Sequence, residues 1–212
     1  MRKMAVLIIA LTLSNTGCMS LANFLLYVAK GLPKFPAEYE GLEGKRVAVV
    51  CVSASDSYGP SPLTSRIARE VQAQLAAQVS EVDVVRESEV SDYLDHHDWS
   101  QLDYTEVGRG VKADMVVAVE LNQPLILREG PTLHRGKADY TVTVYDIKQN
   151  GEKVFRRREE EFQWPGQARY GVPESKFETA FIKRLGARAA HYFHANEQHA
   201  EIGENTSDIS GF

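Results

Sequence analysis

A polar loop between an apolar strand and a helix is the first candidate for ligand chemistry. Residues 53–60 read SASDSYGP and follow the apolar run 47–52. The side chains that can contact a ligand are Ser55, Asp56, Ser57 and Tyr58. Loops in this position of α/β folds often bind ligands, and backbone amides at a helix start can hold an anion. Because the loop lacks a phosphate-loop lysine and the dinucleotide glycine spacing, a plain capping loop is the alternative.

A charged block and two aromatic residues are candidates for protein docking. Arg156, Arg157 and Arg158 precede three glutamates within one predicted strand. Side chains of a strand alternate between its faces, so both faces carry charge and neither can meet lipid. Such charges protect an edge strand from aggregation, or they guide a partner of opposite charge. Trp164 and Tyr170 either form an exposed aromatic patch suited to protein contact or pack against the domain.

The histidines and cysteines do not predict a metal or catalytic centre. His96 and His97 are adjacent, so they point in different directions on a helix, and no third ligand is suitably spaced. Cys51 lies in an apolar run and is interpreted as a small core residue. No nucleophile elbow and no kinase, zincin or flavin signature occurs. We therefore expect no cofactor, no metal and no catalytic residue.

Residues 1–18 indicate export from the cytoplasm. They read MRKMAVLIIALTLSNTGC, with Arg2 and Lys3 before an apolar run and small and polar residues leading to Cys18. This is the layout of a secretory signal peptide, and the apolar run is too short for a bilayer core of about 30 Å. Because residues 19–29 are also rich in apolar side chains, an uncleaved N-terminal anchor is the alternative.

The junction of Gly17 and Cys18 resembles the lipobox of bacterial lipoproteins. Asn15 occupies the position at which that family usually has leucine. The resemblance implies that residues 1–17 are removed and that Cys18 is acylated and becomes the first residue. A lipid then anchors the protein to a membrane from outside the cytoplasm. Met19 stands where some lipoproteins have the aspartate that retains them at the inner membrane, so the resemblance favours the outer membrane.

The composition fits one globular domain with extensions at both ends. The chain has 212 residues, of which 43% are hydrophobic and 25% are charged. With 24 basic against 29 acidic residues, the net charge is -5 and nothing favours nucleic-acid binding. We divide the chain into a signal peptide (1–17), a lipidated tether (18–43), an α/β domain (44–196) and a disordered acidic tail (197–212).

The first half of the domain alternates between strands and helices. Apolar runs predict strands over residues 45–52, 82–86 and 113–121. Ser61 and Pro62 predict the start of a helix, because serine is a good N-cap and proline fits the first helical position. Shorter helices are expected over residues 88–95 and after Asp103. This order is typical of parallel strands joined by right-handed crossovers.

The second half predicts an antiparallel hairpin and a closing helix. Residues 139–147 and 152–163 form the two strands, and Asn150 and Gly151 form the turn. A capping box that begins at Ser175 predicts the last helix, which buries Phe177, Phe181, Leu185 and Tyr192. The expected fold class is therefore α/β (α+β), with a mixed sheet made of a parallel unit and a C-terminal hairpin.

This order of elements over residues 46–194 is similar to a domain of two known envelope families. The segments that carry the resemblance include RVAVVCV, SRIAREVQAQLAAQ, GRGVKADMVVAVEL and VTVYDIKQNGEKVF. They resemble the domain shared by the curli-secretion lipoproteins and the amino-terminal region of TolB. The resemblance implies a fold and a compartment, and it does not name a partner.

Together these patterns predict a non-catalytic protein anchored in the cell envelope and facing the periplasm. We expect an adaptor or accessory subunit of a complex for export, transport or cell-wall assembly, because a tether raises the effective concentration of weak contacts. Two alternatives remain. One is a small-ligand-binding or enzymatic domain that uses the 53–60 loop, and the other is a structural subunit that self-assembles through an edge strand.

Overall fold

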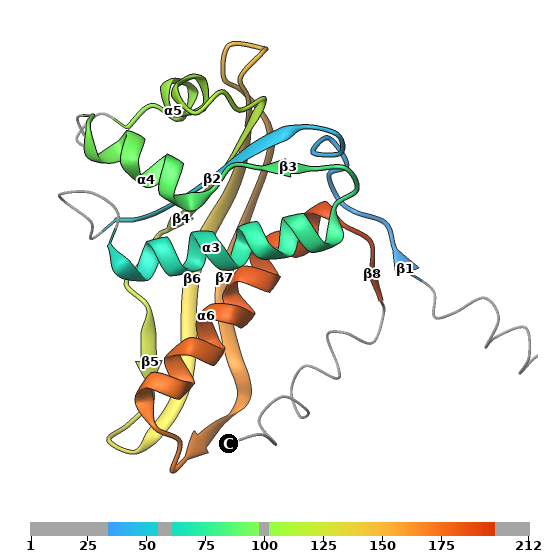
Figure 1. Ribbon diagram of the computed structural model, residues 1–212. Coiled ribbons are helices and arrows are strands. Elements are labelled where there is room, and N and C mark those ends of the chain that lie inside the picture. Colours follow the sequence, from blue (N-terminus) through green and yellow to red (C-terminus); the bar gives the residue numbers. More distant parts are fainter. Residues whose placement is uncertain (1–33, 55–60, 98–101, 198–212) are drawn as a thin grey trace, which may run out of the picture.

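A six-stranded mixed sheet forms the centre of the computed structural model, which describes residues 34–54, 61–97 and 102–197 (Figure 1). Its parallel part has β2 (Arg46–Ser53) between β3 (Asp83–Val84) and β4 (Met115–Leu121). Strand β2 is a run of β-branched residues that is buried on both faces, as expected for a covered parallel strand. The predicted strands over 45–52 and 113–121 are confirmed, whereas the one over 82–86 is only two residues long.

An antiparallel part continues the sheet beyond β4. Strand β6 (Leu133–Asp146) pairs with β4, with the short β5 (Ile126–Arg128) and with β7 (Glu152–Tyr170). The predicted turn is confirmed, since Asn150 and Gly151 have φ values of 56° and 78° between β6 and β7. Both strands are longer than predicted, and the mixed α/β class is confirmed.

Helix α3 (Pro62–Gln78) follows β2 and packs on one face of the sheet. The predicted cap is confirmed, because Ser61 Oγ accepts a hydrogen bond from the Thr64 amide at 3.3 Å. Ile67, Val71 and Leu75 form its buried stripe. Helices α4 (Glu87–Asp95) and α5 (Tyr104–Gly110) pack on the opposite face.

Helix α6 (Glu174–Ala190) lies beside α3 on the same face and leads into the 3-10 helix η2 (His191–Phe193) (Figure 1). The predicted burial of Phe177, Phe181, Leu185 and Tyr192 is confirmed. The predicted capping box at Ser175 is wrong. The N-cap is Pro173, and no side chain makes a capping hydrogen bond to the helix.

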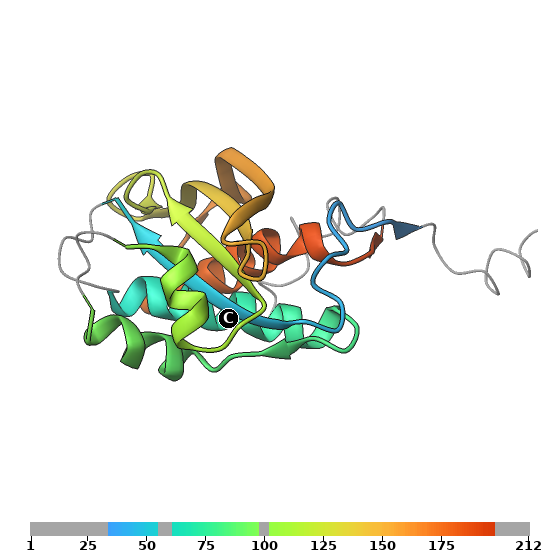
Figure 2. The same ribbon diagram turned by 90° about the horizontal axis from the view of Figure 1, so that it is seen from above.

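The two ends of the described chain pair with each other. Strands β1 (Lys34–Phe35) and β8 (Asn196–Glu197) are antiparallel, and both project from the same side of the domain (Figure 2). The amides of Glu38 and Tyr39 also donate to the Tyr192 carbonyl at 2.9 and 3.1 Å. Residues expected to belong to the tether are therefore held against the domain from Lys34 onward.

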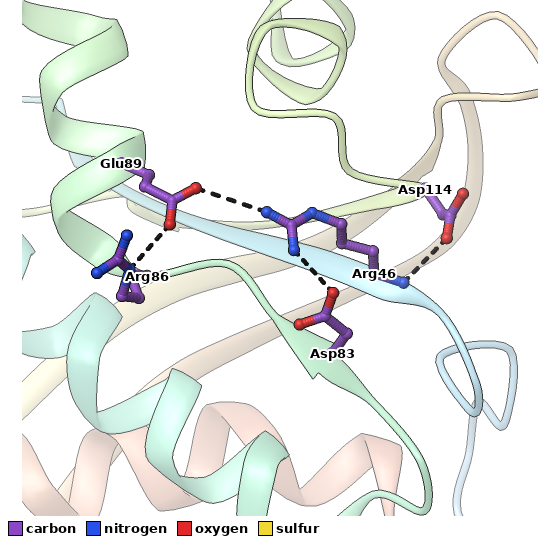
Figure 3. A network of polar contacts seen from close by, with 5 residues as sticks. All are labelled: Arg46, Asp83, Arg86, Glu89 and Asp114. Atoms are coloured by element: carbon purple, nitrogen blue, oxygen red, sulfur yellow. Dashed lines mark hydrogen bonds and ion pairs between the residues drawn. The ribbon is translucent and has the colours of Figure 1, made fainter.

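A polar network holds the amino ends of the parallel strands together (Figure 3). The Arg46 guanidinium donates to Asp83 at 2.7 Å and lies 3.5 Å from Glu89 at the start of α4. The Arg46 amide donates to the Asp114 carboxylate at 2.9 Å, and Lys148 Nζ lies 2.7 Å from that carboxylate. Strands β2, β3 and β4 are thereby joined at one end.

Asp114 gives this network a pH dependence. Hydrogen bonds from Lys148 and from the Arg46 amide lower the pKa of the Asp114 carboxyl below its ordinary value. A lowered pKa means that the stabilisation is complete above about pH 4 and is lost as the pH falls through the folded-state pKa. We expect Asp114→Asn to lower the urea midpoint at pH 7 and to reduce the further loss in acid. The exposed Asp95→Asn is the control, and equal acid sensitivity in both variants would contradict this role.

Candidate functional site

Strand β7 divides the charged block 156–161 between the two faces of the sheet. Its register places Arg157 opposite Val142 and Arg156 opposite Thr143. Val142 belongs to the core under α3 and α6, and Thr143 faces the opposite side because neighbouring strand residues alternate. Among the described elements β7 pairs only with β6, so it is an edge strand. Adjacent arginines therefore have different surroundings.

On the α6 side, the charged side chains of β7 bond to other parts of the domain. Arg157 Nε donates to Glu38 at 2.5 Å. Glu159 accepts from Arg188 Nη2 at 3.0 Å and from the Tyr192 hydroxyl at 2.8 Å. Burial and the Glu159 hydrogen bond raise the pKa of Tyr192, so this hydroxyl stays protonated as a donor. These contacts fasten the N-terminal segment and the end of α6 to the hairpin.

The other side carries what we call the polar sheet face, which comprises Tyr104, Glu120, Thr141, Thr143, Arg156 and Arg158. Two rows of paired residues cross the strands here. Glu120, Thr141 and Arg158 form one row, and Ala118, Thr143 and Arg156 form the next. Neighbouring side chains in such rows are about 5 Å apart. Thr141 and Thr143 are each only 2% exposed, so the part of these rows that meets solvent consists of the arginines and the half-buried Glu120.

Tyr104, the first residue of α5, lies at the border of the polar sheet face and contacts Glu120. The Tyr104 hydroxyl donates to Glu120 Oε1 at 2.8 Å, and its ring lies 4.9 Å from that of Tyr145. Burial and the Glu120 carboxylate raise the pKa of Tyr104 strongly, which keeps this hydroxyl protonated. The pair therefore positions the Glu120 carboxylate and does not transfer protons at neutral pH.

The two arginines of this face are available to a partner. Arg158 Nε lies 3.1 Å from Glu160, but both side chains are more than half exposed, so the pair contributes little. Within the described ranges, Arg156 has no carboxylate at ion-pair distance. The face thus offers two guanidinium groups two residues apart on an edge strand, a pattern that matches acidic groups on an extended partner.

The two aromatic docking candidates are not equivalent. Trp164 is buried at 4% exposure, and its ring lies 5.9 Å from that of Phe177, so its side chain packs under α6 and is not part of a surface patch. Tyr170 is 74% exposed and pairs across the strands with the exposed Leu133. Of the two alternatives, packing against the domain therefore holds for Trp164, and only Tyr170 is exposed.

Other predicted residues lie outside the described residues. Cys18 and the loop residues Ser55, Asp56, Ser57 and Tyr58 belong to this group. The described flank of the loop is fixed to β4, because the Ala54 amide donates to the Leu121 carbonyl at 3.1 Å. Cys51 is buried in the core, as expected.

The histidines make local contacts. His96 and His97 each place Nδ1 2.6 Å from a carbonyl of α4, and His191 Nδ1 lies 2.6 Å from the Arg188 carbonyl. In the part of the chain that the structure describes, no group of three or more potential metal ligands occurs. None of the helices in these ranges has the length and apolar character needed to cross a membrane.

Sequence reasoning missed that Tyr104, Glu120, Thr141 and Thr143 lie on one side of the sheet. A weak signal was present, since Glu120 interrupts the apolar strand MVVAVEL and the two threonines alternate with valine in TVTV. A lone polar residue in each strand becomes informative only when the register of β4, β6 and β7 aligns them.

These features define a mixed α/β domain in which a long antiparallel hairpin extends a parallel βαβ unit. No protein-family profile matches the chain, and no curated protein matches its sequence. Among solved structures, the PelC dodecamer from Paraburkholderia phytofirmans is similar, with 12% identity, a TM-score of 0.41, and coverage of 74% of this chain and 96% of that one.

Two further structures are similar to the same degree. Lipoprotein GNA1162 from Neisseria meningitidis has 10% identity and a TM-score of 0.41, covering 68% of this chain and 97% of its own. A hypothetical protein from Chlamydia trachomatis has 16% identity and a TM-score of 0.38, covering 69% of this chain and 96% of its own. None of these likenesses defines what this chain does.

The division of the charged block predicts different effects for two adjacent glutamates. Glu159→Gln is expected to lower the free energy of unfolding by about 2 kcal/mol, because it weakens charge-assisted bonds to Arg188 and Tyr192 at a half-buried site. Glu160→Gln removes only an exposed ion pair with Arg158, so the free energy of unfolding is expected to change by less than about 0.5 kcal/mol. Urea denaturation of both variants measures the difference, and equal losses would contradict the assigned faces.

Proposed function

We propose that this protein is a membrane-anchored accessory protein of the cell envelope that binds a partner through the polar sheet face. The observation that carries the proposal is the contrast between the two sides of β7. All three arginines are exposed, but Arg157 and Glu159 bond to Glu38, Arg188 and Tyr192 elsewhere in the domain. Within the described ranges Arg156 has no carboxylate at ion-pair distance, and Arg158 pairs only with Glu160 of the same strand. The proposed binding role is non-catalytic.

Three features support a tethered adaptor. The lipobox-like junction at Cys18 supplies the anchor in this proposal. The tether reaches the domain at β1, where it pairs with β8 on one side of the molecule (Figure 2). Confinement at a membrane raises the local concentration of the domain, so two exposed guanidinium groups on an edge strand suffice for a weak contact. We infer a partner with acidic side chains at alternating positions of an extended segment.

Site-specific crosslinking in intact cells tests the proposal. A photoreactive amino acid is placed at Arg156 or at Arg158, and the matched control position is the exposed Arg86, the N-cap residue of α4. The expected result is a crosslink to the same envelope protein from positions 156 and 158 and not from position 86. Crosslinks from position 86 alone, or none from 156 and 158, would overturn the assignment of this face.

A further inference from the structure

Two side-chain nitrogens on the α6 side of the hairpin are buried without a hydrogen-bond partner. They are Nδ1 of His134 and Nε of Arg169. His134 lies in β6 and is 7% exposed, and Arg169 lies directly opposite it in β7. Buried polar groups in folded proteins are nearly always hydrogen-bonded, and an arginine is always charged. Arg169 Nε can only donate, and His134 Nδ1 also donates in one of its tautomers, so the two groups can share an acceptor that the chain itself does not supply.

The start of α6 brings further donors to the same place. The amides of Lys176 and Phe177 both donate to the Pro173 carbonyl, at 3.1 and 3.0 Å, and no side chain caps the helix. The amides of Glu174 and Ser175 precede these bonds, so they have no partner within the helix. The His134 ring lies 5.2 Å from the ring of Phe177, in the first turn of α6. A helix of 17 residues also presents the positive end of its dipole here.

A third cation borders this region. Arg128 in β5 pairs with His134 across the strands, and its Nε donates to Glu174 at 3.1 Å. Both of these side chains are half exposed, so their ion pair is weak. Among the described residues, Glu174 forms its ion pair with Arg128 and not with Arg169. In Figure 1, α6 begins beside β5 and the adjoining ends of β6 and β7. The Arg169 guanidinium is left without a counter-charge among the described residues.

We propose that Arg169, His134 and the first turn of α6 bind an oxyanion group of the phosphate type. The guanidinium of Arg169 donates to the anion, as do the amides of Glu174 and Ser175, and His134 donates from Nδ1 in the tautomer that carries its proton there. Arg128 forms the outer wall. The phosphate can belong to a free ion or to a phospholipid headgroup. This anion site lies on the opposite face of the sheet from the polar sheet face and does not depend on it.

Nuclear magnetic resonance of the full ¹⁵N-labelled chain in detergent micelles tests the anion site. Inorganic phosphate is added at constant ionic strength, and the amides of Glu174 and Ser175 are followed together with Arg169 Nε. The expected result is a saturable shift of these signals. Arg169→Gln is expected to weaken binding about tenfold or more, because it removes a charge-assisted contact. Arg109→Gln removes the same charge from an exposed position on α5 and is expected to leave binding unchanged.

Two further measurements make the test decisive. Arg169→Lys serves as a second variant in case Arg169→Gln fails to fold. It keeps the charge and loses the planar donor pair, so it is expected to bind phosphate more weakly than the unchanged chain. Phosphatidylglycerol in the micelles identifies a headgroup as the source when it shifts the same amides and free phosphate does not. Shifts that do not saturate, shifts equal in the Arg169 and Arg109 variants, or no shift with either probe would overturn the proposal.

Discussion

Replacing Phe181 by alanine is expected to lower the free energy of unfolding by about 3–5 kcal/mol. Phe181 is fully buried on α6, and its ring lies 5.8 Å from Phe162 of β7 and 6.4 Å from Phe177. It therefore joins the closing helix to the hairpin that carries both proposed sites. Removing the ring leaves a cavity that the surrounding aromatic residues cannot fill without moving. Urea denaturation followed by circular dichroism measures the loss.

Tyr170→Ala provides the matched control for Phe181→Ala. It also truncates an aromatic residue, but Tyr170 is exposed at the end of β7. Its effect on the free energy of unfolding is expected to stay within about 0.5 kcal/mol. A loss for Phe181→Ala no greater than that for Tyr170→Ala would show that α6 does not pack on the hairpin as described.

A valine at Gly136 is expected to destabilise the domain by about 3 kcal/mol. Gly136 lies in β6 under α6, where an added Cβ would stand 2.0 Å from Cδ2 of Phe181. The new side chain must push α6 away from the sheet or force Phe181 into another rotamer. The thermal midpoint of unfolding measures the loss.

Gly130 offers the corresponding control position. No heavy atom lies within 4 Å of a Cβ added there, so Gly130→Val is expected to leave the midpoint almost unchanged. Equal midpoints for the two valine variants would contradict the close approach of α6 to β6. The anion site would then also lose its basis, because its donors come together only if α6 lies on the hairpin.

The sequence predicts the parts of the fold that have a regular hydrophobic period. The valine-rich strand β2 and the stripe of α3 follow directly from such periods. The outer halves of β6 and β7 do not, because the segments LHRGKA and WPGQARY mix glycine, proline and charges. These outer halves form strands because they pair with each other along the hairpin and pack under α6. Strands β1, β5 and β8 are two or three residues long and depend on their partners alone.

The sequence predicts the proposed sites less completely than the fold. It identifies Arg156 and Arg158 as charged strand residues, but it cannot show that Arg157 between them is already bound to Glu38. It also leaves open whether Trp164 and Tyr170 form an exposed patch or pack against the domain, and the structure shows Trp164 packed and Tyr170 exposed. The anion site is absent from the sequence pattern, because Arg128, His134 and Arg169 come from three strands and meet only through their register.

The mass of the intact protein from the membrane fraction of native cells tests the central claim most directly. A membrane-anchored accessory protein is predicted to lack residues 1–17 and to carry acyl chains on Cys18. A Cys18→Ser variant is then predicted to leave the membrane fraction. A full-length, unmodified chain in the soluble cytoplasmic fraction would contradict both the anchor and the envelope function proposed for the polar sheet face.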